Sequence, residues 1–144
     1  MRYTFDTSTI ITRRLTSFPG DFVLASVVWM EMMASASDDK QRRIYEGWAR
    51  AHRANGSFIL PEADDWLLAG RILNSLSIRR RRQAGGAAPK LAPGRSQRMA
   101  LDALLATSAH RAQVTVVTEN WDDFHAIKYY LRGFKVMRAA EFFA

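Results

Sequence analysis

Short apolar runs alternate with amphipathic segments along most of this chain, and this alternation limits the folds that it can adopt. The runs are rich in β-branched and aromatic side chains, as is typical of buried strands. They cover residues 3–5, 22–25, 58–60, 114–118 and 134–137. Strands separated by helices predict an α/β fold with a central, mainly parallel sheet, whose functional cleft lies at the carboxyl ends of the strands.

The amphipathic segments carry the signals that begin and end helices. Ser26 is a suitable N-cap after the second run, and Asp38 can open the helix that follows. Gly56 ends that helix, and Pro61 begins another with acidic residues in its first turns. The predicted helices span residues 8–15, 26–36, 38–54, 61 onward, 97–112 and 125–131.

Length and composition limit the organisation of the chain. Its 144 residues fit one domain, and a 48% hydrophobic content is enough for a core. The absence of cysteine excludes disulfides and thiolate zinc sites and fits a reducing compartment. Neither a long apolar run nor a secretory signal pattern occurs. We therefore expect a single cytoplasmic domain over residues 1–144 that does not span a membrane.

The excess positive charge lies in one segment. The formal net charge is +7, and residues 79–98 contain seven cations and no acid, so this segment accounts for the whole excess. Its glycines and prolines predict an irregular basic loop inserted between two helices. Clustered cations attract nucleic acid, although a solvated linker can have the same composition. The candidate RNA-binding residues are Arg79, Arg80, Arg81, Arg82, Lys90, Arg95 and Arg98.

Four acidic residues occupy positions that a solvated charge would not favour. Asp6 ends the first predicted strand, and Asp123 follows the fourth. Glu31 and Asp102 lie inside largely apolar helical segments. Burying a carboxylate is costly unless a cation or hydrogen bonds compensate, and each residue taken singly could have an ordinary partner. Taken together, two acids at strand ends and two on helices indicate one shared cleft.

Clustered carboxylates repel one another, and a divalent cation relieves that repulsion. Ligands that are all oxygen favour Mg²⁺ or Mn²⁺ over zinc. A hard cation beside a phosphodiester activates water and neutralises charge on the phosphate oxygens. The acids and the basic segment together predict a site where protein cations bind a polyanion and metal ions hydrolyse it.

Around these acids the sequence resembles the PIN-domain nucleases, and among them the VapC toxins of prokaryotic toxin–antitoxin pairs. The resemblance runs from residue 3 to about residue 137. The family's opening strand ends in Asp-Thr-Asn or Asp-Thr-Ser, and a helix after the second strand carries a glutamate. The motifs as they stand here are Asp6-Thr7-Ser8, Ala25-Ser26-Val27-Val28-Trp29-Met30-Glu31, Asp102-Ala103-Leu104-Leu105-Ala106 and Thr118-Glu119-Asn120-Trp121-Asp122-Asp123-Phe124. The basic segment is longer than the family pattern leads us to expect.

The resemblance implies a PIN-like three-layer sandwich with the activity of an Mg²⁺- or Mn²⁺-dependent endoribonuclease, the toxin of a type II toxin–antitoxin module. It implies that Asp6, Glu31, Asp102 and Asp123 are catalytic and hold the metal, directly or through water. Asp122 is a second candidate beside Asp123. The implied supporting residues are Thr7, Ser8, Thr118 and Asn120. The implied partners are RNA, a VapB-type antitoxin and a second copy in a homodimer.

Two other functions stay open from the sequence. The chain could be a housekeeping metal-dependent nuclease, in which case its expression would be harmless and no antitoxin gene would accompany it. It could also be an RNA-binding PIN module without catalysis, which the retention of all four acids argues against. Binding without turnover under any divalent metal would favour that last alternative.

Overall fold

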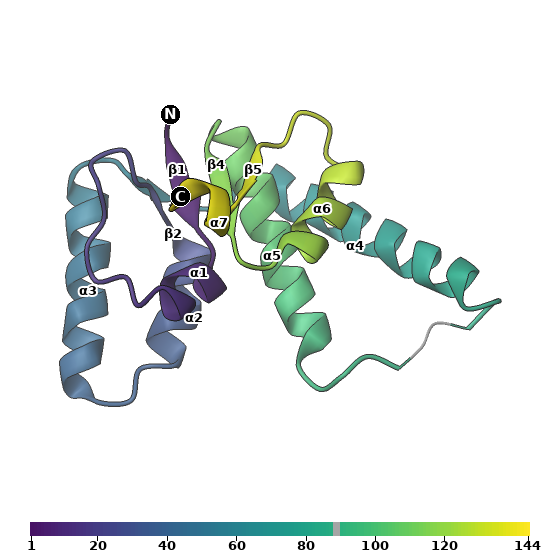
Figure 1. The fold of residues 1–144 in the computed structure, drawn as a ribbon, viewed down its shortest axis with the longest axis horizontal. Helices are drawn as coiled ribbons and strands as arrows, with labels where there is room; N and C mark the ends of the chain where they lie inside the picture. Colours follow the sequence, from purple (N-terminus) through teal and green to yellow (C-terminus); the bar gives the residue numbers. More distant parts are fainter. Residues whose placement is uncertain (88–89) are drawn as a thin grey trace.

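A parallel sheet forms the centre of the computed structural model, which describes residues 1–87 and 90–144 (Figure 1). The strands are β1 (Tyr3–Phe5), β2 (Leu24–Ala25), β3 (Phe58–Ile59), β4 (Thr115–Thr118) and β5 (Val136–Arg138). β1, β4 and β5 pair in that order, and β2 pairs with β3. A parallel bridge between Tyr3 and Phe22 places the second pair beside β1. The strands therefore follow the order β3-β2-β1-β4-β5, and every pairing is parallel.

This strand order creates a switch point next to β1. The chain goes from β1 to β2 and β3 on one side and later adds β4 and β5 on the other side. Such a reversal opens a crevice at the carboxyl ends of the two strands that flank it. β1 and β4 are in register from Tyr3 with Thr115 to Phe5 with Val117. Asp6 and Thr118, the next residue on each strand, therefore meet at the same edge.

Helices flank the sheet, with α3 at one end of the view and α4 at the other (Figure 1). The helices are α1 (Thr7–Thr12), α2 (Ser26–Ala34), α3 (Asp39–Ala54), α4 (Ala63–Gln83), α5 (Arg95–Arg111), α6 (Trp121–Tyr129) and α7 (Ala139–Phe142). Asp38 caps α3 as predicted, because its side chain accepts from the Gln41 amide. In the described parts of the chain, no helix is long and apolar enough to cross a membrane. The α/β class with a central parallel sheet is confirmed.

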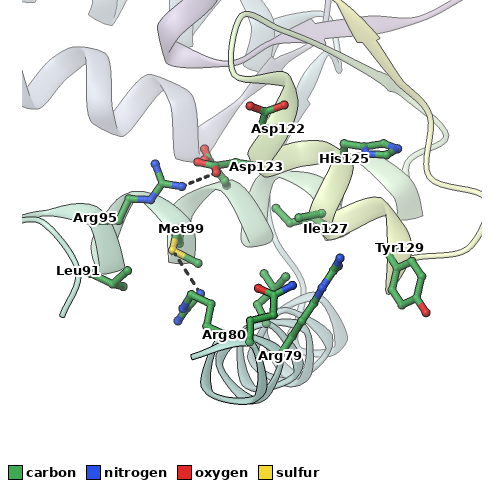
Figure 2. A pocket seen from close by; sticks show the side chains of 14 residues that line it. Arg79, Arg80, Leu91, Arg95, Met99, Asp122, Asp123, His125, Ile127 and Tyr129 are labelled. Carbon is green, nitrogen blue, oxygen red and sulfur yellow. Dashed lines mark hydrogen bonds and ion pairs between the residues drawn. The ribbon is translucent and has the colours of Figure 1, made fainter. Parts of the chain in front are cut away.

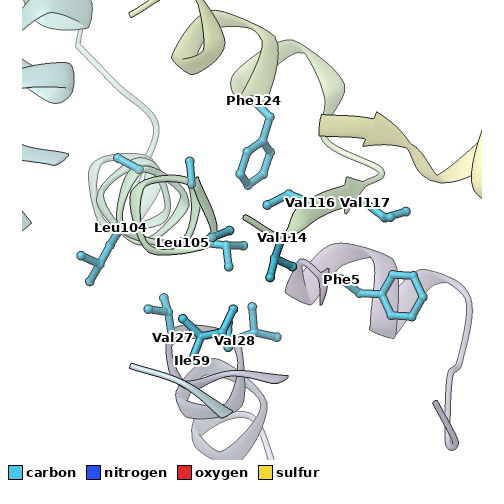
Figure 3. Close-up of a cluster of buried hydrophobic side chains, with 14 of the residues drawn as sticks. Phe5, Val27, Val28, Ile59, Leu104, Leu105, Val114, Val116, Val117 and Phe124 are labelled. Carbon is cyan, nitrogen blue, oxygen red and sulfur yellow. The ribbon is translucent and has the colours of Figure 1, made fainter. Parts of the chain in front are cut away.

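The core lies between the sheet and its covering helices (Figure 3). Every residue of α5 from Ala103 to Ala109 is buried, so this helix is enclosed on all sides over two turns. Phe124 of α6 and Val117 of β4 pack into the same core and are fully buried. Asp102 precedes the enclosed part of α5 by one residue, which explains how a carboxylate comes to be half-buried.

The predicted basic loop over residues 79–98 is wrong at both ends. α4 continues through Gln83, so Arg79, Arg80, Arg81 and Arg82 belong to its last turns, where cations are favoured by the helix dipole. α5 begins at Arg95 rather than at residue 97, after Gly94 adopts a left-handed φ of 77°. Residues 84–87 and 90–94 connect the two helices, and residues 88 and 89 lie outside the described part. The seven cations therefore lie mainly on helices.

Other predicted boundaries also shift, for local reasons. α1 ends at Thr12 and does not reach residue 15, because Arg14 takes a left-handed φ of 51°. Ser26 is the first helical residue of α2, not its cap, and that helix stops at Ala34. α6 begins at Trp121 rather than at residue 125, so Asp123 lies in its first turn. α7 was not predicted, and β5 begins two residues later than expected.

Candidate functional site

Asp6 is the acid most firmly held in place. It follows β1 directly, is 3% exposed and caps α1, because its Oδ1 accepts from the Thr9 amide at 2.9 Å. The Thr9 hydroxyl lies 2.5 Å from the same oxygen. Oδ2 accepts from the hydroxyls of Ser8 at 2.9 Å and Thr118 at 2.5 Å. Hydrogen bonds from α1 and β4 therefore compensate the burial of this carboxylate.

Glu31 reaches the same edge from α2. The Thr7 hydroxyl donates to its Oε1 at 2.9 Å, which ties the start of α1 to the middle of α2. Burial raises the pKa of the Glu31 carboxyl, and the nearby Asp6 carboxylate adds to the rise, while the hydrogen bond from Thr7 opposes it. Thr7 and Ser8, at the start of α1, therefore bond to two different acids, Glu31 and Asp6.

Asp102 is the acid with the least compensation. Burial, followed by the charges of Asp6, Asp123 and Glu31, raises the pKa of its carboxyl to about 8, and Arg95 offsets only part of this rise. Its one hydrogen bond among the described residues is a long contact of 3.4 Å from Asn120 Nδ2. Carboxylates from three helices and a strand end thus act on one another, with too little positive charge between them.

Asn120 connects the remaining acid to this group. Its Nδ2 donates to Asp123 Oδ2 at 2.8 Å and contacts Asp102, so one amide spans both carboxylates. Its backbone amide donates at 2.7 Å to the Thr118 hydroxyl, which itself donates to Asp6. This chain of polar contacts links three of the four acids. Asp122, the second candidate, is exposed and receives no such bond in the described residues.

Arg95 takes a position that the sequence did not predict for it. Its Nη2 forms an ion pair with Asp123 Oδ1, from the first turn of α5 to the first turn of α6. The prediction placed Arg95 on a phosphate-binding loop, whereas the structure places it on a helix, with its guanidinium partly exposed beside the carboxylates. Gly94, in the left-handed conformation, is the N-cap of α5, so Arg95 is the first residue of the helix.

A pocket of about 410 Å³ opens beside these acids (Figure 2). Asp102, Asp123 and Arg95 line it, and Figure 2 shows Arg79 and Arg80 approaching from α4 on the side opposite Asp123. The other predicted cations are placed differently. Arg82 lines a neighbouring hollow, and Arg81, Lys90 and Arg98 are exposed outside the lining of both.

The donor set fits a hard divalent cation, although the carboxylates do not form a closed cage. No three acids or histidines in residues 1–87 and 90–144 are close enough to ligate one ion as they stand. Mg²⁺ keeps several waters and needs only one or two direct carboxylates, so such a cage is not required. The observation that favours a cation is Asp102, which is half-buried beside three other acids and has a strongly raised pKa.

The four acids and the four side chains expected to support them therefore lie near one another beyond the carboxyl ends of β1 and β4, while their role stays a prediction. Thr9 was missed, although its hydroxyl contacts Asp6 and its backbone amide donates to the capping Asp6 carboxylate. The signal was present, since a cap residue bonds the amide three positions later. The pocket residues Met99 and Tyr129 carried no sequence signal, because helices distant in sequence bring them together.

Comparisons with known proteins identify the fold. No protein-family model matches the chain, and no curated protein does. A chain in the structure of VapBC-1 from nontypeable Haemophilus influenzae is 16% identical, with a TM-score of 0.59 and coverage of 97% of this chain and 99% of that one. A chain of DNA-bound VapBC from Salmonella typhimurium is 17% identical, with a TM-score of 0.57 and coverage of 96% and 98%. A chain of FitAB bound to an IR36 DNA fragment is 15% identical, with a TM-score of 0.56 and coverage of 95% and 94%. The chain has the PIN-like fold predicted from its motifs.

Proposed function

We propose that this protein is an endoribonuclease that depends on Mg²⁺ or Mn²⁺ and acts as the toxin of a type II toxin–antitoxin pair. The observation that carries the proposal is the meeting of Asp6, Glu31, Asp102 and Asp123 at the β1–β4 switch point, with Asp102 under-compensated. Clustered acids with too little positive charge between them are the arrangement that a divalent metal stabilises.

The residues present would divide the work as follows. Asp102, Asp123, Asp6 and Glu31 would hold the metal, partly through water. When bound, the metal would activate water and neutralise the negative charge on the phosphate oxygens. Thr118 and Asn120 would keep the carboxylates in position, since Thr118 donates to Asp6 and Asn120 contacts both Asp123 and Asp102. Arg79 and Arg80 would bind the RNA backbone from the other side of the pocket.

The proposed toxin role rests on the fold and on the kind of protein in which similar folds have been solved. Structures with similar folds include two VapBC assemblies and FitAB, two of them solved with DNA. A chain with this fold and an acidic site fits the VapC resemblance seen in the motifs. We propose that a VapB-type antitoxin covers the site and that the chain forms a homodimer.

Cleavage of RNA by the purified protein tests the activity. We expect total RNA to be cut in Mg²⁺ or Mn²⁺ and to stay intact when EDTA removes the metal, with mapped ends showing internal cleavage. RNA that remains intact under both metals across pH 6–9 would contradict the proposal and favour a binding module.

Expression in cells separates a toxin from a housekeeping nuclease. We expect growth arrest that a co-expressed upstream gene product relieves. Active enzyme whose expression leaves growth unchanged would retain the nuclease and reject the toxin role.

Arg95→Gln is expected to strengthen metal binding. The Arg95 guanidinium competes with a divalent ion for the Asp123 carboxylate, so its removal leaves one more negative charge for the metal. We expect the dissociation constant for Mn²⁺, measured by calorimetry without RNA, to fall roughly tenfold. Arg53→Gln removes the same charge from an exposed position on α3 and serves as the matched control. Equal affinities in both variants would show that Arg95 does not compete with the metal.

A further inference from the structure

The pocket beside the carboxylates has an apolar part that a metal site does not need. Its lining includes the apolar side chains of Leu76 of α4, Met99 of α5 and Ile127 of α6. Figure 2 shows Ile127 between the acids and Tyr129, with the two α4 arginines opposite. A volume of about 410 Å³ is in the lower part of the range for small-molecule sites, which suits a group of nucleotide size.

Two cations border this apolar wall without a carboxylate partner. The Arg79 guanidinium lies 5.5 Å from the centroid of the Tyr129 ring, and Arg80 Nη1 lies 3.8 Å from Met99 Sδ. No ion pair in the described residues involves either arginine. Tyr129 is 77% exposed, so its ring is available for stacking. The pocket thus combines an aromatic ring, an apolar wall and uncompensated positive charge.

We infer that this pocket binds one unpaired nucleotide of the RNA substrate, next to the phosphate held at the carboxylates; the inference rests on the proposed nuclease function. The base would stack on Tyr129 and contact Met99, while Arg79 and Arg80 would contact the adjoining phosphates. Proteins that bind single strands join aromatic platforms to basic grooves in this way. A paired base has no free face to offer the pocket.

An acidic protein segment is the other occupant that the arginines could attract. The lining of the pocket favours the nucleotide, because it also includes Asp102 and Asp123. Those carboxylates would repel an acidic peptide, whereas a phosphodiester could approach them through a divalent cation.

Binding of short RNA in EDTA tests the pocket independently of cleavage. The probe is a fluorescein-labelled six-nucleotide RNA, free or annealed to its complement, followed by anisotropy. We expect the single strand to bind at least tenfold tighter than the duplex. Tyr129→Ala should weaken single-strand binding roughly tenfold, the loss expected for one stacked base, and Tyr129→Phe should restore it. Arg53→Ala is the control, because Arg53 is exposed on α3 and does not line the pocket. It should change the affinity less than twofold.

A set of RNAs that each lack one base identifies the subsite itself. The wild-type protein should bind the RNA that lacks the stacked base more weakly than it binds intact RNA. Tyr129→Ala should bind these two RNAs equally well, because the stacking between base and ring is already lost. Arg79→Ala should weaken intact and abasic RNA alike and reduce the salt dependence.

Three binding results would overturn the inference. They are equal binding of single strand and duplex, equal weakening of intact and abasic RNA by Tyr129→Ala, and displacement of bound RNA by an acidic peptide at lower concentration than by unlabelled RNA. Cleavage that is normal in Tyr129→Ala with unchanged site preference rejects the subsite alone. Base-dependent binding by a protein that cuts no RNA under any metal rejects the nuclease function alone.

Discussion

Asp102→Asn is expected to lower metal-dependent RNA cleavage about 100- to 1,000-fold while the protein stays folded. Asp102 is at the centre of the candidate site, because the charges of all three other acids act on its carboxyl. Asparagine has the same shape but lacks the charge that holds a cation. The measurement is the initial rate of cleavage of a labelled RNA at saturating Mn²⁺.

The control for this loss is Glu46→Gln, which removes the same charge from an exposed position on α3. Its cleavage rate should stay within twofold of the wild-type rate. Circular dichroism should show that both variants keep the helical content of the parent protein. Cleavage by Asp102→Asn at the wild-type rate would show that the acids at the switch point do not carry out the chemistry.

The same substitution is expected to stabilise the metal-free protein at alkaline pH. Burial and neighbouring acids raise the pKa of Asp102 to about 8, whereas the unfolded chain has a value near ~3.9. The folded state therefore keeps a proton that the unfolded state has lost between these values, and the wild-type free energy of unfolding falls as pH rises through this interval. Asparagine has no proton to lose. Below pH ~4 the two proteins should differ little.

The expected gain is on the order of 2–5 kcal/mol at pH 8.5, because each unit of pKa shift is worth ~1.4 kcal/mol. Urea unfolding of both proteins in EDTA at pH 4.5 and 8.5 measures it, and the pH dependence of the difference isolates Asp102 from other titrating groups. Adding Mn²⁺ at pH 8.5 should stabilise the wild-type protein by ~2.7 kcal/mol at 100 times the dissociation constant. Asp102→Asn should gain much less from the metal. If the difference in free energy of unfolding between the two proteins does not change with pH, the pKa of Asp102 is not raised.

Much of the fold could be predicted because its signals are local. Short β-branched and aromatic runs identified all five strands within a few residues, and alternation with helices predicted a parallel sheet. The helix boundaries were less accurate. The glycines and prolines after residue 84 predict a loop that begins at residue 79. The helix instead continues to Gln83 and ends just before the first of these glycines, Gly85. Arginine is a good helix former and is favoured near a helix C-terminus, so charge alone does not break a helix.

The sequence by itself identified the four acids that the fold brings near one another, since a carboxylate at a strand end or within an apolar helix needs a compensating partner wherever the chain places it. Only the tertiary structure decided which basic side chain pairs with these acids and which residues form the pocket beside them. The pairing of Arg95 with Asp123 and the pocket between Arg79 and Tyr129 join residues on different helices. Helix spacing and strand alternation relate residues a few positions apart, whereas contacts across the core depend on how whole elements pack.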